Sequence, residues 1–128
     1  MKAERLFALE GDVKEVVAII RPSRAKLTKQ KLADKGFVAY TEERVSGRGK
    51  QKGLQYGGDS GSDGKGGISF LPKRMLTLFV GASDLESVLG VLIEANKTGE
   101  MGDGKIFIAP VTDAVRIRTD ERKGAALV

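Results

Sequence analysis

The 128-residue chain contains neither cysteine nor histidine. The absence of cysteine excludes disulfide bonds and thiolate metal sites, and the absence of histidine removes the commonest general base and metal ligand. Aromatic residues make up only 5% of the chain. RNA-binding sheets usually carry paired aromatic side chains that stack on bases, and Phe107 has no such companion nearby. The sequence therefore offers no obvious group for catalysis, and we expect no nucleic-acid partner.

Long apolar runs are also missing. The first twelve residues carry Glu4, Glu10 and Asp12 instead of a signal-peptide core, and no stretch reaches the length of a membrane span. With 41% apolar and 30% charged residues, the composition is typical of one globular domain. We therefore predict a cytoplasmic protein without membrane insertion. Its formal charge of +5 favours anionic metabolites as ligands.

Glycine is abundant, and the segment 98–107 (Thr-Gly-Glu-Met-Gly-Asp-Gly-Lys-Ile-Phe) is the most informative part of the chain. Its glycines let backbone N–H groups approach an anion closely, and its lysine adds a point charge. Two arginines about ten residues later alternate as on one face of a strand. The set consists of Gly99, Gly102, Gly104, Lys105, Arg116 and Arg118. It predicts a site for the polyphosphate of a nucleotide.

Two alternatives compete with this interpretation. The spacing of Gly99 and Gly104-Lys105 matches most of a P-loop, but Ile106 stands where a Mg²⁺-binding Ser or Thr belongs. The motif also follows an expected helix and precedes an expected strand, which is the reverse of a P-loop. The other alternative is a Gly-rich turn that binds nothing.

The apolar pattern predicts four strands, at 13–21, 37–46, 74–80 and 105–109, and the segment 111–119 extends or follows the last one. A first helix is expected at 24–35, capped by Ser23, ended by Gly36 and buried on one side. A second helix follows an expected capping box at 83–86 and ends at Gly99. The expected inward residues are Ala25, Leu32 and Ala33 on the first helix, and Leu85, Val88, Leu89, Leu92 and Ile93 on the second.

This order predicts an α+β, ferredoxin-like βαββαβ sandwich. The strands are apolar at nearly every position, which is typical of sheets buried on both faces. Because two helices cover only one face, we expect a homo-oligomer. Between the halves, the segment 47–67 holds nine of the seventeen glycines, and we expect a long mobile loop. It is either functional or simply an exposed connection.

At this point the residues resemble a known family, the PII signal-transduction proteins. The motifs that carry the resemblance are 19–22 (Ile-Ile-Arg-Pro), 47–53 (Gly-Arg-Gly-Lys-Gln-Lys-Gly), 70–73 (Phe-Leu-Pro-Lys), the segment 98–107 and 115–119 (Val-Arg-Ile-Arg-Thr). The resemblance implies a homotrimeric PII ferredoxin-like domain at 13–128, with a T-loop at 47–67 and a B-loop at 98–105. Residues 1–12 are an N-terminal extension without a counterpart in the family.

The resemblance also implies ATP or ADP in the cleft between subunits. Its base and ribose would lie near Thr41, Gly47, Gly49, Lys50 and Phe79, and its phosphates near Gly102, Asp103, Gly104, Lys105, Arg116 and Arg118. Gln51 would help to coordinate Mg²⁺ between ATP and the effector 2-oxoglutarate. Lys73 would pair with the distal carboxylate of 2-oxoglutarate, and the loop stem at Lys52 and Gly53 would close over it. The alternative is that the lysines are solvated surface cations.

The loop sequence looks most like the nitrogenase-associated branch of the family, in which two PII-like subunits act together on nitrogenase. The resemblance thus implies a non-enzymatic regulator, with or without a second PII-like chain. The alternatives are a general PII regulator of an ammonium transporter or glutamine synthetase, and a small phosphate-binding enzyme. Two departures from the family are visible. The modified tyrosine of many members falls here on Gly66 or Asp63, depending on the counting, and Asp120 replaces a glycine.

Overall fold

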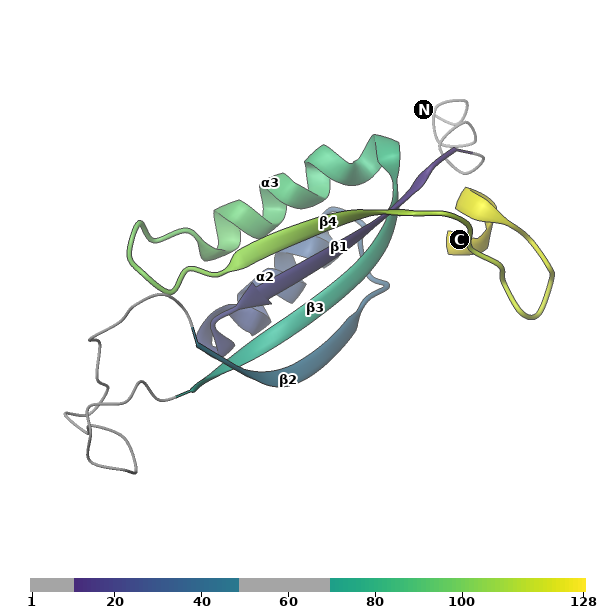
Figure 1. Ribbon diagram of the computed structural model, residues 1–128. Helices are drawn as coiled ribbons and strands as arrows, with labels where there is room; N and C mark the ends of the chain where they lie inside the picture. Colours follow the sequence, from purple (N-terminus) through teal and green to yellow (C-terminus); the bar gives the residue numbers. More distant parts are fainter. Residues whose placement is uncertain (1–10, 49–69) are drawn as a thin grey trace.

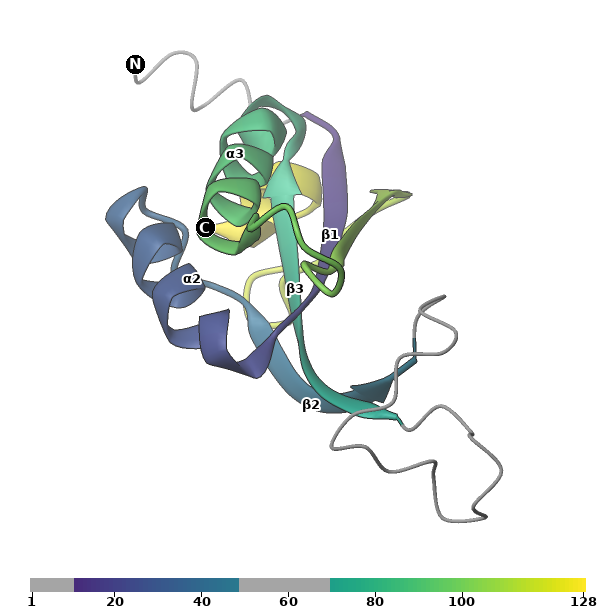
Figure 2. The ribbon, with the colours of Figure 1, turned by 90° about the vertical axis from the view of Figure 1, so that its left-hand side faces the viewer.

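The computed structural model describes residues 11–48 and 70–128 (Figure 1). It contains strands β1 (Val13–Ile20), β2 (Thr41–Gly47), β3 (Leu71–Gly81) and β4 (Lys105–Val111), and helices α2 (Pro22–Asp34) and α3 (Leu85–Asn96). The strands form one antiparallel sheet in the order β2-β3-β1-β4. Both helices cover the same face of the sheet (Figure 2). This arrangement confirms the predicted α+β, ferredoxin-like fold.

Two of the predicted strand boundaries were wrong. Strand β2 begins at Thr41 and not at residue 37, because Phe37 and Tyr40 leave the strand path and pack against the core. Strand β3 begins at Leu71, three residues before the prediction, and includes Pro72. Pro72 precedes Arg74, the first residue of β3 that pairs with β1, so its missing N–H group costs the pairing with β1 nothing. In this first part of the strand β3 pairs only with β2, where Pro72 lies opposite Ser46.

Both predicted helix caps were wrong, and so was the predicted end of the second helix at Gly99, because α3 ends at Asn96 and Lys97 is already extended. The predicted stop of α2 at Gly36 was right. Pro22 takes the first position of α2, so Ser23 lies inside the helix and Arg21 becomes the N-cap residue without a side-chain capping bond. Ahead of α3, a 3₁₀ turn at Ala82–Asp84 replaces the expected capping box. At the other end of α2, Gly36 has a φ of +88° and donates to Ala33 O at 2.9 Å. That left-handed conformation suits glycine and ends the helix.

The core lies between the sheet and the two helices. Val16, Ala18 and Ile20 of β1 lie on the same face of the sheet as Leu76, Leu78 and Val80 of β3, and the helices cover this face. The helical core residues are Ala25, Thr28 and Leu32 on α2, and Val88, Val91, Leu92 and Ala95 on α3. Two expected inward residues were wrong, because Ala33 is exposed and Ile93 is 50% exposed.

A polar contact joins the two helices inside this core. Asn96 Nδ2 donates to Thr28 Oγ1 at 3.0 Å and to Leu92 O at 2.9 Å. Thr28 in turn donates to Arg24 O at 2.7 Å. The buried stripe of α2 therefore follows residues 25, 28 and 32, a spacing of three and four residues, and Ala33 lies one step outside it.

In the part of the chain that the structure describes, neither α2 nor α3 covers the opposite face of the sheet. Strand alternation places Val17, Ile19, Met75, Phe79 and Phe107 on this open face. Phe79 is 48% exposed and Phe107 is 54% exposed. The apolar character of both faces, which the sequence predicted, is therefore present in the fold, and the homo-oligomer that would bury the open face stays a prediction. In the described part of the chain, no helix has the length and apolarity needed to cross a membrane.

Leu32 and Leu27 offer a matched test of the packing of α2. Leu32 is fully buried and Leu27 is 37% exposed. We expect Leu32→Ala to lower the free energy of unfolding by about 2–5 kcal/mol, because it removes core contacts and leaves a cavity. Leu27→Ala should cost less than about 1 kcal/mol. Urea unfolding at a fixed protein concentration measures both, and equal losses would contradict the orientation of α2.

Candidate functional site

The Gly-rich loop between α3 and β4 has a backbone that requires glycine at three places. Gly99, Gly102 and Gly104 have φ values of +86°, +92° and +107°. At Gly104 there is also no room for a side chain, because a Cβ atom would lie 2.1 Å from Ile19 O. The loop therefore lies directly against the backbone of β1.

Asp103 holds this loop together. Its carboxylate accepts hydrogen bonds from the backbone N–H groups of Thr98 and Gly99 at 2.8 and 2.9 Å, and one from the Thr98 hydroxyl. It also accepts one from Arg21 Nη1 at 2.7 Å. The bonds from Thr98, with smaller contributions from Arg21 and Gly99, hold the pKa of Asp103 well below its ordinary value. The carboxylate is thus charged at neutral pH and directed into its own loop, and the phosphate contact that the family resemblance implied for Asp103 stays a prediction.

A groove lies beside the loop on the open face of the sheet and encloses about 400 Å³. It is lined by the end of β2, by the starts of β3 and β4, and by the loop. Six of the predicted site residues come together here, namely Gly47, Lys73, Gly102, Asp103, Gly104 and Lys105. Arg48, Ile19, Leu71, Glu100 and Phe107 complete the lining. Glycine backbone and cations thus meet in one hollow, which suits an anionic ligand.

Lys73 connects β3 to the loop. Its ammonium group donates to Gly102 O at 3.3 Å. Burial lowers the pKa of Lys73, and the nearby charge of Arg21 lowers it further. An anion in the groove would relieve both effects, since it would solvate the ammonium group and offset the neighbouring positive charge.

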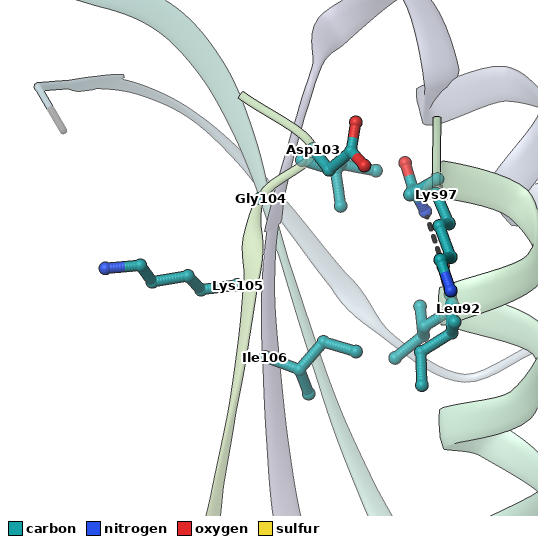
Figure 3. Close-up of a pocket in the computed structure, with 9 residues that line it drawn as sticks. Leu92, Lys97, Asp103, Gly104, Lys105 and Ile106 are labelled. Carbon is teal, nitrogen blue, oxygen red and sulfur yellow. Dashed lines mark hydrogen bonds between the residues drawn. The ribbon is translucent and has the colours of Figure 1, made fainter. Parts of the chain in front are cut away.

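Lys105 points to the open face. Figure 3 shows its side chain on the opposite side of β4 from Ile106, Leu92 and Lys97. Those three residues line a smaller, mostly apolar pocket of about 210 Å³ between α3 and the loop. The alternation of strand side chains therefore places the lysine of the predicted site in the groove and its isoleucine neighbour against the helix.

Arg116 and Arg118 do not share a strand face, so that prediction was wrong. Only a single bridge, between Val115 and Arg122, forms in this segment, and residues 117–119 make a turn. Arg116 instead donates to Glu121 at 2.8 Å and to the carbonyl oxygens of Ala125 and Ala126 at 3.3 and 3.5 Å. The chain bends back because the C-terminal residues supply these acceptors.

The two groups of predicted phosphate ligands lie at opposite ends of the sheet (Figure 1). Lys105 pairs with Ile19 at one end of β1, whereas Val111 pairs with Val13 at the other. The seven residues of β4 span roughly 20 Å, and the two arginines follow beyond them. A single chain therefore does not bring Arg116 and Arg118 to the groove. Thr41 and Phe79 also lie outside it, on β2 and β3.

Asp120 adopts the left-handed conformation, with a φ of +61°. Its N–H group donates to Arg116 O at 2.8 Å, which closes the turn. The turn thus keeps a backbone shape that usually belongs to glycine, and aspartate is one of the few other residues that tolerates it.

Sequence reasoning assigned no role to Arg21, although it noticed the motif 19–22. Arg21 donates to Asp103 and, through Nη2, to Met101 O at 2.8 Å. The sequence did contain a signal, because this arginine lies between a buried strand and a proline that starts a helix. The partner, 82 positions away, could not be read from it.

Other predictions fall outside the described residues. These are the predicted ligands Gly49, Lys50, Gln51, Lys52 and Gly53, with the Mg²⁺ role of Gln51, and the modification positions Asp63 and Gly66. The P-loop alternative, in contrast, is excluded. The Gly-rich segment follows helix α3 and precedes strand β4, whereas a P-loop follows a strand and precedes a helix.

Comparison with known proteins gives a consistent result. A family model described as nitrogen regulatory protein P-II matches residues 13–121. A "nitrogen fixation nifHD region glnB-like protein 2" of Methanococcus maripaludis is 42% identical over 90% of this chain and 100% of its own length.

In Methanothermobacter marburgensis, GlnB-like proteins 2 and 1 of the nifHD region are each 40% identical, over 90% and 85% of this chain and 100% and 97% of their own lengths. Among solved structures, Arabidopsis thaliana PII bound to citrate superposes with a TM-score of 0.70 at 33% identity. That similarity covers 91% of this chain and 92% of the Arabidopsis chain.

Gly104 and Gly99 provide a matched pair for testing the loop. Both have positive φ, but a Cβ atom at Gly99 would meet nothing within 4 Å. We expect Gly99→Ala to cost about 1–2 kcal/mol for the backbone conformation alone. Gly104→Ala should cost roughly 1–3 kcal/mol more because of the clash with Ile19. Chemical unfolding compares them, and equal effects would show that the loop does not lie against β1.

Proposed function

Because the chain belongs to the nitrogen regulatory protein P-II family, we propose that it is a non-enzymatic signal transducer of nitrogen status. It binds ATP or ADP in clefts between subunits and responds to 2-oxoglutarate. The observation that carries this proposal is the separation of the predicted phosphate ligands into two groups at opposite ends of one sheet. Neither group forms a complete polyphosphate site by itself, so a second copy must supply the missing half.

The groove supplies the first half of the site. The amides of the Gly-rich loop and the ammonium group of Lys105 match phosphate oxygens, because fixed dipoles and a cation suit a multiply charged anion. Asp103 contributes indirectly, since it shapes the loop that presents the amides. Gly47 at the base of the T-loop also lines the groove. We expect the nucleoside on this side, with Lys50 as a further contact.

A neighbouring subunit supplies the second half. Arg116 and Arg118 are the predicted phosphate ligands of that half, and Thr41 and Phe79 are its base and ribose contacts. The apolar open face, with Phe79 and Phe107 about half exposed, supports an assembly in which copies meet sheet to sheet. We propose a homotrimer, in which three such contacts close on themselves and form three equal sites.

Lys73 marks the place of the second ligand. Its partly buried ammonium group lies at the edge of the groove next to the loop. The similar Arabidopsis protein has citrate bound, which is a small polycarboxylate. We propose that the distal carboxylate of 2-oxoglutarate pairs with Lys73. Gln51 would complete the site through Mg²⁺ between this ligand and ATP, and Lys52 and Gly53 would close over it.

The names of the relatives favour a role in nitrogen fixation. Two different GlnB-like proteins of one organism, both from the nifHD region, match this chain at 40% identity. We propose that the T-loop contacts nitrogenase, in the cytoplasm, and that a second PII-like chain takes part. Regulation of an ammonium transporter or glutamine synthetase is the competing function, and the names of the relatives give it no support.

Two half-site variants test the shared site. Lys105→Ala removes a cation from the groove, and Arg118→Ala removes one from the turn at 117–119. Neither side chain makes a hydrogen bond among the described contacts. We expect each variant alone to lose ATP binding in isothermal titration. In a 1:1 mixture that is unfolded and refolded together, about a quarter of the sites should recover, because each mixed trimer contains one cleft with two intact halves. If no ATP binding recovers, the two residues either belong to a site within one subunit or bind no ATP, and the shared site is contradicted.

The proposed target can be tested by affinity capture. Tagged protein incubated with extract of nitrogen-fixing cells should retain nitrogenase without 2-oxoglutarate and release it when Mg-ATP and 2-oxoglutarate are added together. Lys73→Met should retain nitrogenase under both conditions, because it cannot pair with the carboxylate. Capture of glutamine synthetase or an ammonium transporter instead would favour the competing function.

A further inference from the structure

Arg21 occupies the junction between β1 and α2 and connects it to the Gly-rich loop. Its guanidinium group donates from Nη1 to Asp103 Oδ1 at 2.7 Å and from Nη2 to Met101 O at 2.8 Å. About a quarter of each side chain in the Arg21–Asp103 pair is exposed. The pair is therefore shielded in part from water, and each charge has a partner within hydrogen-bond distance.

The peptide between these two contacts lies against Arg21. A Cβ atom at Gly102 would come within 3.3 Å of Arg21 Nη2. From the other side, Lys73 donates to Gly102 O. The segment 101–103 is thus held between a guanidinium and an ammonium group from two different elements. Among the described residues, Arg21 has a carboxylate partner and Lys73 has none, which leaves Lys73 available to a ligand.

We propose that Arg21 is a positioning residue for phosphate binding, and that its contacts with Asp103 and Met101 hold the glycine amides of the loop in the arrangement that a nucleotide requires. This inference rests on the proposed function. Arg21 acts through the loop, since its guanidinium donors are directed to loop oxygens. A loop that is ordered before the ligand arrives spares the ligand the entropy cost of ordering it.

The geometry explains why the residue is arginine. Two donors of one planar group reach two acceptors on residues 101 and 103 at the same time. A lysine presents its charge at a single point and cannot make both bonds with the same fixed geometry. The rigid fork therefore fixes both the position and the orientation of the intervening peptide at Gly102.

The test compares Arg21→Gln with Arg24→Gln. Arg24 lies one turn further along α2 and donates to Ala95 O at 3.5 Å, away from the loop. We expect Arg21→Gln to weaken ATP binding about tenfold, the change typical of a lost charge-assisted contact, whereas Arg24→Gln should change it by less than about twofold. Arg21→Lys should recover part of the loss. Adenosine, measured by competition, should bind equally to all variants, because it has no phosphate for the loop to hold.

Asp103→Asn provides the second measurement. If Arg21 acts through Asp103, the double variant should lose clearly less affinity than the sum of the two single losses, because both changes break the contact between Arg21 and Asp103. Additive losses, an equal loss for adenosine, or unchanged ATP binding in a folded Arg21→Gln protein would overturn the inference while the proposed function stands. A wild-type protein that binds no ATP would overturn both. Circular dichroism checks that each variant is folded.

Discussion

The close approach of the Gly-rich loop to β1 is the constraint on which the site depends. Gly104 lies so near Ile19 O that no side chain fits between the two backbones. That contact fixes the start of β4, and the pairing of Lys105 with Ile19 follows from it. Strand alternation then decides that Lys105 faces the open side and Ile106 the core. The position of the cationic groove is thus set by one backbone contact that only glycine allows.

Charge is divided between residues that build the site and residues that are available to a ligand. Asp103 and Arg21 neutralise each other while they hold the loop. Lys73 and Lys105 line the groove without a carboxylate partner among the described contacts. Arg116 is engaged by Glu121 and two C-terminal carbonyl groups, and a phosphate at Arg116 would have to compete with Glu121. In one half of the proposed site the cations are therefore free of described carboxylate partners, whereas in the other half Arg116 is already paired with Glu121.

Some predictions from local sequence patterns were wrong, because an adjacent residue or a contact outside the pattern had the stronger effect. Ser23 looked like a cap, but Pro22 already fits the first helical position and moves the start of α2. Of the five inward residues predicted at 85–93, only Ile93 was wrong. The buried side of α3 instead includes Val91 and Ala95, and the bond between Asn96 and Thr28 accompanies it. Arg116 and Arg118 alternate as in a strand, but the acceptors at Glu121 and beyond bend the chain into a turn. The periodicity of apolar and charged residues does not reveal these interactions.

The sequence by itself determined the order of strands and helices, the helix stop at Gly36 and the glycines that the backbone of the Gly-rich segment requires. Each of these depends on neighbours within a few residues, through propensity, φ preference or charge. The family resemblance was equally visible there, because its motifs are continuous. The tertiary structure decided that Arg21 meets Asp103, that Lys73 meets Gly102, and that the predicted phosphate ligands separate to the two ends of the sheet. Those relations join residues tens of positions apart, and only the pairing of β1 with β3 and β4 fixes their distances.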